Sequence, residues 1–148
     1  MTTTLASIGF SRAKAELSDV MTHVVHDRSP QIVSRHRGKE EMLLVGTRDL
    51  AQFLDSFRFE PRLTIEPGEV TAELEQLGLV GFGETTEEAM QDLVEELRVY
   101  AHDFFERASF YAETDRAGHA PWLLRFAVTP PERQLDLLYE DSRAAAAV

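Results

Sequence analysis

The sequence contains no cysteine and no long hydrophobic run. Without cysteine, disulfides and thiolate metal sites are excluded, so any metal ligand would have to be His, Asp or Glu. No segment approaches the roughly 20 apolar residues of a membrane span, and residues 1–10 lack the basic start and apolar stretch of a signal peptide. We therefore expect a cytoplasmic protein that has no contact with a membrane and is stabilised by packing.

Positive charge is also scarce, because 15 Lys and Arg stand against 26 Asp and Glu, for a net charge of −11. A uniformly acidic surface repels phosphate. The deficit is uneven: residues 1–50 hold seven basic and six acidic side chains, whereas the rest of the chain holds eight and 20. Only the N-terminal part therefore offers a plausible face for DNA.

The chain is long enough for one medium domain or two small ones, and 43% hydrophobic residues are typical of a folded protein. Glu60-Pro61-Arg62 is the expected boundary, because proline ends a helix there and the charge balance changes sign. We expect two domains, residues 1–60 and 61–148, in a mixed α+β fold.

The first 60 residues alternate between strand and helix signals. A β-prone run at residues 2–8 precedes a helix with apolar side chains at helical spacing, which Pro30 stops. Two more β-prone runs, residues 31–34 and 42–45, flank a charged segment and predict a hairpin with a basic tip. From residue 47 we expect a helix that carries Leu50, Phe53, Leu54 and Phe57 on one face.

The remaining residues predict an antiparallel hairpin and one long helix. Residues 63–66 and the alternating run 69–74 are expected strands around a turn at Pro67-Gly68. After a glycine-rich stretch, Thr85 and Glu88 form a capping box at the start of a helix whose apolar stripe extends to Ala108. Beyond it we expect a last strand at 122–128, a C-terminal helix at 132–139 and a frayed tail at 144–148.

The N-terminal third resembles the Phd/YefM (prevent-host-death) antitoxin domain over residues 5–57. The likeness lies in Phe10-Ser11-Arg12-Ala13-Lys14-Ala15-Glu16-Leu17-Ser18, Pro30-Gln31-Ile32-Val33-Ser34-Arg35, Gly38-Lys39 and Met42-Leu43-Leu44-Val45. This resemblance implies an α/β homodimer that binds operator DNA, normally followed by a disordered tail that folds on a toxin.

The second part departs from that pattern, because residues 63–106 have the signals of a folded domain. They resemble a HicB-like antitoxin domain, chiefly in Gly78-Leu79-Val80-Gly81-Phe82-Gly83-Glu84-Thr85-Thr86-Glu87-Glu88-Ala89. HicB proteins often carry a DNA-binding segment after this domain, and none is visible here, which fits a fusion in which the N-terminal domain supplies that activity. The two families neutralise different toxins, so the identity of the toxin stays open.

The candidate DNA-binding residues are basic side chains of the first helix and the hairpin tip: Arg12, Lys14, Arg35, Arg37 and Lys39. Taken alone, such charges indicate a solvated turn and an ordinary surface helix. The resemblance favours contacts to phosphates instead, and no residue pattern indicates whether Arg12 also contacts base edges.

Toxin binding is expected in the acidic second part, with apolar anchors near the C-terminus. The candidates are Trp122, Leu135, Leu137, Leu138 and Tyr139, although Trp122 is equally compatible with a place in the core. A toxin that acts on RNA is usually basic, so the acidic segment would attract it.

Other chemistry has little support in the sequence. His23 and His26 share a helix face with Asp19 nearby, but no metal-binding signature is present, and they are more typical of surface or interface histidines. There is no nucleophile elbow, P-loop or dinucleotide fingerprint, and the carboxylates opposite the apolar stripe are typical of a solvated helix face. We expect no enzyme activity, no cofactor and no metal.

These observations predict a type II antitoxin that neutralises a partner toxin and represses its own operon by binding operator DNA. It would act as a homodimer, with a larger assembly when toxin is bound. Two alternatives stay open: a non-catalytic interaction module whose basic tip is incidental, and an RNA-associated protein, since HicB-like folds resemble small α/β RNA-binding domains. Binding to its own promoter separates the first reading from both alternatives.

Overall fold

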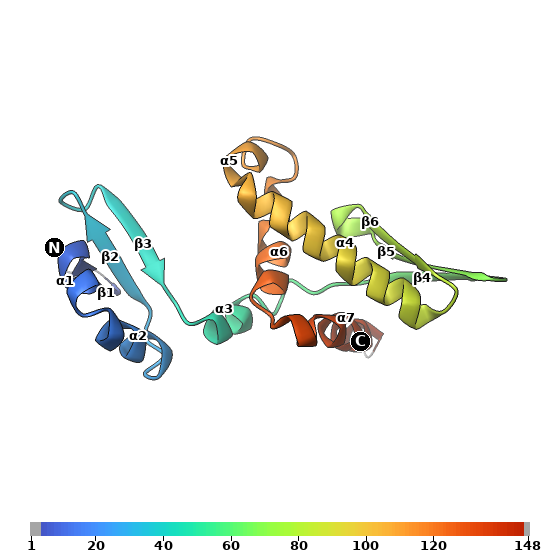
Figure 1. Cartoon of the computed structure of the whole chain (residues 1–148), viewed down its shortest axis with the longest axis horizontal. Coiled ribbons are helices and arrows are strands. Elements are labelled where there is room, and N and C mark those ends of the chain that lie inside the picture. The colour runs from blue at the N-terminus through green and yellow to red at the C-terminus, as the bar shows by residue number, and fades with distance from the viewer. Residues whose placement is uncertain (1–3, 147–148) are drawn as a thin grey trace. The chain divides into compact units, whose positions relative to one another are not determined.

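The computed structural model describes residues 4–146. The chain is a mixed α+β protein (Figure 1). Its internal contacts divide it between Gln52 and Phe53. We call residues up to Gln52 the N-terminal unit and those from Phe53 the C-terminal unit. Each unit has a three-stranded sheet and a hydrophobic core of its own.

The N-terminal unit contains a small mixed sheet with helices on one face. Its elements are β1 (Ala6–Gly9), α1 (Phe10–Ala15), α2 (Leu17–Val25), β2 (Gln31–Arg35), β3 (Glu40–Leu44) and α3 (Thr47–Phe53), which crosses the division. β2 lies in the middle, parallel to β1 and antiparallel to β3. The expected strand at 2–8 therefore begins at Ala6, and residues 2 and 3 lie outside the described part of the chain.

The core of this unit is small. It consists of Ile8, Ala13, Val20, Val24 and Val33, with Leu44 packed against it. The core members of α2 are four residues apart, Val20 and Val24, so one stripe of the helix faces the sheet. The expected helical face at 47–57 is only partly correct, because α3 ends at Phe53 and leaves Leu54 and Phe57 outside it.

The C-terminal unit places one long helix across an antiparallel sheet. The strands are β4 (Arg62–Glu66), β5 (Glu69–Leu74) and β6 (Leu79–Gly83) in that order, and the helices are α4 (Thr86–Glu106), α5 (Ala108–Tyr111), α6 (Ala120–Ala127) and α7 (Gln134–Ala146). Short 3-10 turns occupy Glu75–Leu77, Ala117–His119 and Pro131–Arg133. α4 packs on β5, β6 and α6.

Glycines allow α4 to lie against β6. A Cβ on Gly81 would lie 2.4 Å from the carbonyl oxygen of Ala89, and one on Gly83 would lie 2.6 Å from the Ala89 nitrogen. The expected capping box forms in part: the Glu88 N–H donates to Thr85 Oγ1 at 3.1 Å, but Glu88 Oε2 accepts from the Glu84 N–H at 2.9 Å and not from that of Thr85. The glycine-rich stretch thus permits close helix–sheet packing.

A buried ion pair joins α6 to α7. Arg125 donates to both carboxylate oxygens of Asp141, at 2.6 and 3.0 Å, and Asp141 also accepts from the Phe59 N–H at 2.8 Å. Phe59 is fully buried in the core of this unit. These hydrogen bonds therefore hold the segment before β4 against α6 and α7. The boundary expected at Pro61 comes after Phe59 in the chain, so it would separate Phe59 from the helices that it contacts.

Two expectations about the C-terminal third are wrong or incomplete. Residues 122–128 are not a strand: α6 covers Ala120–Ala127, with Pro121 in its first turn, where the missing proline N–H costs no hydrogen bond. The C-terminal helix is longer than the expected 132–139, because α7 continues to Ala146. Of the expected frayed tail, residues 147–148 lie outside the described part.

Candidate nucleic-acid interface

The tip of the β2–β3 hairpin has an unusual backbone. His36, Arg37 and Gly38 follow one another in the left-handed region, with φ of 55°, 58° and 81°. A left-handed residue other than glycine costs roughly 1–2 kcal/mol, so this turn holds two costly positions. The Lys39 N–H closes it by donating to the His36 carbonyl at 3.2 Å. The result is a tight tip on which Arg37 and Lys39 are exposed.

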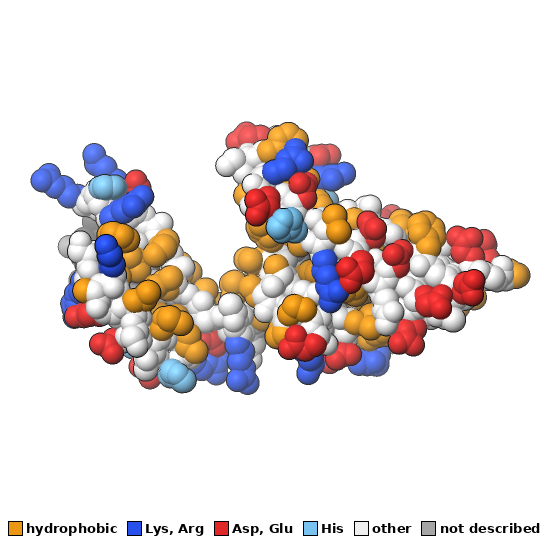
Figure 2. Space-filling model, viewed as in Figure 1, with side chains coloured by type: hydrophobic (Ala, Val, Ile, Leu, Met, Phe, Trp, Pro, Cys, Tyr) orange, Lys and Arg blue, Asp and Glu red, His pale blue; other side chains and the backbone are white. Residues whose placement is uncertain are grey.

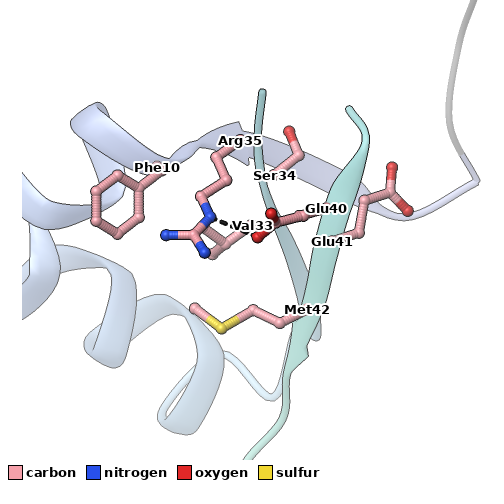
Figure 3. Close-up of a pocket in the computed structure, with 7 residues that line it drawn as sticks. All are labelled: Phe10, Val33, Ser34, Arg35, Glu40, Glu41 and Met42. Carbon is pink, nitrogen blue, oxygen red and sulfur yellow. Dashed lines mark hydrogen bonds and ion pairs between the residues drawn. The ribbon is translucent and has the colours of Figure 1, made fainter. Parts of the chain in front are cut away.

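Arg35, at the end of β2, is held by two neighbours. Its Nε donates to Glu40 Oε2 at 2.6 Å, and its guanidinium lies 5.9 Å from the centre of the Phe10 ring. Figure 3 shows the side chain between Phe10 and Glu40, with Met42 on the same side of β3 and Glu41 turned away. A cation over an exposed ring contributes about 0.5–1 kcal/mol. Arg35 is thus positioned in advance, although Glu40 offsets part of its charge.

The first helix contributes Arg12 and Lys14, which point in different directions because residues two apart do not share a helix face. Arg12 Nε donates to Glu16 Oε2 at 3.1 Å. Arg12 also lines a hollow of about 540 Å³ together with Arg35 and His36. The parallel pairing of Gly9 with Ser34 causes this, because it sets the start of α1 beside the end of β2.

Three of the five predicted side chains have no carboxylate beside them in the described part of the chain. Among residues 4–146, Lys14, Arg37 and Lys39 have no ion-pair partner, whereas Arg12 and Arg35 pair with exposed carboxylates. Figure 2 shows Lys and Arg side chains gathered over the tip of the N-terminal unit and acidic side chains spread over the C-terminal unit. Exposed pairs contribute only about 0–1 kcal/mol, so a phosphate can displace Glu16 or Glu40. This arrangement suits a polyanion.

An uncovered apolar surface lies in the same unit. Met42 pairs with Val33 and so shares the helix side of the sheet, yet 54% of it is exposed, because β3 is an edge strand. Beside it, a groove of about 270 Å³ is lined by Phe10, Val33 and Met42 together with Ser34, Arg35, Glu40 and Glu41 (Figure 3). Leu17, Met21 and Val25 of α2 are also exposed. We call Phe10, Leu17, Met21, Val25 and Met42 the apolar surface of the N-terminal unit.

The expected toxin-binding side chains are mostly part of the C-terminal core. Leu138 is fully buried, and Leu135, Leu137 and Tyr139 are partly buried against the core. Trp122 donates its Nε1–H to the Arg58 carbonyl at 3.1 Å and meets the Phe57 ring edge-on at 5.1 Å. A toxin contact by Leu138 would require α7 to leave the core.

Residues that the sequence did not single out form an aromatic cluster around the end of α4. The Tyr100 hydroxyl lies 2.6 Å from His119 Nδ1, and the Tyr111 hydroxyl donates to Asp103 Oδ2 at 2.5 Å. Burial, helped by Arg116, lowers the pKa of His119, and the Tyr111 hydrogen bond lowers the pKa of Asp103. The Tyr100–His119 pairing depends on the fold of residues 112–119, and the Tyr111–Asp103 pairing depends on the turn between α4 and α5.

The histidines of α2 do not form a metal site in the described structure. His23 Nδ1 lies 3.1 Å from Asp27 Oδ2, one turn away. Within residues 4–146, no three His, Asp or Glu side chains gather in a way that could hold a metal ion. No helix in the same range is long and apolar enough to cross a membrane.

Comparison with known proteins links the chain to toxin–antitoxin systems. A family model, PHD_like, described as antitoxin of toxin–antitoxin, RelE/RelB, TA system, matches residues 1–138. A crystal structure of the antitoxin part of a proposed toxin–antitoxin system from Syntrophomonas wolfei subsp. wolfei has the same fold, with a TM-score of 0.75 and 21% identity. That alignment covers 90% of this chain and 96% of the other. No curated protein matches the chain.

Proposed function

Because the chain belongs to the PHD_like family of toxin–antitoxin antitoxins, we propose that it neutralises a partner toxin and represses its own operon by binding operator DNA as a homodimer. Membership of this family makes it a non-catalytic regulatory protein with a toxin partner. The observation that carries the DNA-binding part is the set of exposed, unpaired cations on the one unit that is not acidic, with Arg37 and Lys39 at the hairpin tip and Lys14 on α1.

DNA binding by this group would be mainly electrostatic. A dimer presenting three unpaired cations from each subunit would neutralise about six phosphates, which gives a log–log salt slope near −5. Arg35 and Arg12 would add contacts once phosphate replaces Glu40 and Glu16. Contacts from these cations to phosphates would fix the position of the protein on the DNA backbone. Recognition of the DNA sequence would come from contacts between the β2–β3 hairpin tip and nearby base edges.

Homodimerisation of the N-terminal unit is supported by its size and its apolar surface. A core of five side chains is too small to stabilise a free domain of about 50 residues comfortably. Met21 is 59% exposed and Met42 54% exposed, on the side of the sheet that carries the helices. A second copy would cover both and extend the core, as the resemblance to Phd/YefM domains implies.

Toxin binding is assigned to the C-terminal unit, which holds 20 acidic and eight basic side chains. This charge would steer a basic, RNA-directed toxin and speed its association. The hairpin, third strand and long helix support the HicB-like interpretation of residues 63–106. Bound toxin would then change operator affinity, either by bridging dimers or by crowding the DNA face.

Gel retardation of a fragment of the chain's own promoter tests the repressor function. Arg37→Ala and Lys39→Ala together should weaken binding about tenfold or more at low salt, and both the effect and the affinity should shrink as salt rises. Arg143→Ala is the matched control, because it removes an exposed, unpaired cation from the C-terminal unit. Equal losses in the two variants, or no retardation at all, would refute the repressor function.

Co-expression with the toxin gene tests the second half of the proposal. The double variant at Arg37 and Lys39 should still protect cells from the toxin, because its C-terminal unit is unchanged. Loss of protection in parallel with loss of promoter binding would mean that the two activities are not divided between the units.

A further inference from the structure

The strand β4 lies at the edge of the C-terminal sheet, and all five of its residues are exposed. Leu63 and Ile65 are nevertheless on the core side of the sheet, because they pair with the buried Ala72 and Val70. α4 covers β5 and β6 and leaves these two side chains 40% and 71% exposed. An apolar strip therefore continues from the core onto an open edge.

The two edges of this sheet differ. At the β6 edge, Asp92 of α4 accepts a hydrogen bond from the Phe82 N–H at 2.8 Å, so a side chain occupies that edge. A two-residue turn joins β4 to β5, so Glu66 and Glu69 form a hydrogen-bonded pair and, by alternation, so do Thr64 and Thr71. The backbone N–H and C=O groups of Leu63 and Ile65 therefore point away from β5, toward the open edge. Pro61 and Pro67 limit the free segment to β4 itself.

Charge on the opposite face of β4 is unbalanced within one chain. Arg62 lies opposite Glu73, with Nη2 3.2 Å from Glu73 Oε2. At the other end of the strand, Glu66 lies opposite Glu69. Like charges directly across a strand pair are destabilising, and no cation pairs with either glutamate among residues 4–146.

We propose that β4 pairs antiparallel with β4 of a second copy about a two-fold axis at Thr64, joining two sheets into one. In this register the five residues are self-complementary. Arg62 meets Glu66 of the second copy, Leu63 meets Ile65 of the second copy, and the two Thr64 side chains face each other. Opposite-charge, β-branched and Thr–Thr pairs each stabilise a strand pair.

This pairing corrects each imbalance described above. The free backbone groups of Leu63 and Ile65 gain partners, and the four apolar side chains come together on the core side, where they are sheltered from water. Each Arg62 reaches a Glu66 that has no cation partner among residues 4–146 of its own chain. The C-terminal unit therefore has a self-association surface of its own, separate from the apolar surface of the N-terminal unit.

The absence of cysteine allows a direct test in the full-length chain. In the proposed register the Thr64 residues form a non-hydrogen-bonded pair with Cα atoms about 4.5 Å apart, within the range of a disulfide. Thr64→Cys should give a covalent dimer under mild oxidation roughly tenfold faster, or more, than Glu66→Cys. Glu66→Cys is the matched control, because it is equally exposed on the same strand but lies about 13 Å from its copy.

A charge exchange tests the register. In the Thr64→Cys chain, Arg62→Glu should slow the disulfide by placing two glutamates opposite each other, and adding Glu66→Arg should restore the rate. Equal rates for Thr64→Cys and Glu66→Cys would overturn the proposal. So would a Thr64→Cys chain that stays uncrosslinked alone, which would leave β4 to another occupant such as a toxin strand.

Discussion

The buried pair Arg125–Asp141 should be the most sensitive charged site in the protein. Asp141 is only 2% exposed and receives two hydrogen bonds from Arg125 and one from the Phe59 N–H. Arg125→Ala would leave the carboxylate buried with that single backbone donor. Removing one partner of a buried ion pair costs about 3–5 kcal/mol, because the remaining charge has lost its compensation.

The neighbourhood of the pair sets the loss near the lower end of that range. Arg58 Nη1 already lies 3.8 Å from Asp141 Oδ1, and this side chain is half-exposed and able to move closer. We therefore expect a loss of about 3 kcal/mol in the free energy of unfolding of the C-terminal unit. With a urea dependence of about 2 kcal/mol per molar, the midpoint should fall by roughly 1.5 M.

Tryptophan fluorescence during urea unfolding provides the assay. Trp122 is the single tryptophan and lies on α6 with Arg125, so its signal reports on the C-terminal unit. Arg133→Ala is the control, because Arg133 pairs only with exposed carboxylates and should cost less than about 1 kcal/mol. Similar midpoints for Arg125→Ala and Arg133→Ala would refute the reasoning.

Three further predictions follow from the same structure. Combining Met21→Glu with Ile65→Lys should reduce the mass measured by light scattering to the 16.7 kDa of one chain, whereas each change alone should leave a larger particle. Gly81→Ala should lower the free energy of unfolding measured in urea by about 1–3 kcal/mol, because its Cβ would lie 2.4 Å from the α4 backbone, while Gly118→Ala, with open space around it, should not. Burial is the main cause that lowers the pKa of His119 below its usual 6.5, so folding favours the neutral ring. The stability that His119 contributes is therefore present above pH 6.5 and is lost as the pH falls below that value. In urea unfolding measured across this pH range, His119→Gln should reduce the pH dependence.

Local signals predicted the elements that depend on neighbouring residues. The capping box at Thr85 and Glu88 gave the start of α4 to within one residue, since the helix covers Thr86–Glu106. The strands around Pro67-Gly68 follow from alternation and a turn that needs positive φ, and Gly68 has a φ of 79°. Such features need no knowledge of the rest of the chain.

The segment 122–128 shows where this reasoning fails. A short apolar run is compatible with a buried strand or a buried helix, and its periodicity does not separate them. The structure makes it a helix, in which Leu123 and Phe126 face the core and Arg125 reaches Asp141. That partner lies 16 residues further along, so the sequence offered no local reason to bury an arginine.

The candidate site was predictable in composition but not in geometry. The five cations could be named because they cluster in the one part of the chain that is not acidic. Which of them are free could not be predicted, because the contact between Arg35 and Phe10 depends on the parallel pairing of β1 with β2. The pairing of Arg35 with Glu40 likewise depends on the hairpin register.

The hydrogen bond from Phe59 to Asp141 also affects the order of folding during synthesis. It joins residues 82 positions apart, so the C-terminal unit cannot complete these contacts until Asp141 has left the ribosome. The N-terminal unit closes its sheet and core within its first 52 residues. Domains fold as they emerge, N-terminal first. A nascent chain would therefore expose its basic N-terminal residues, on a unit whose small core a second copy would complete, while the acidic unit is still being made.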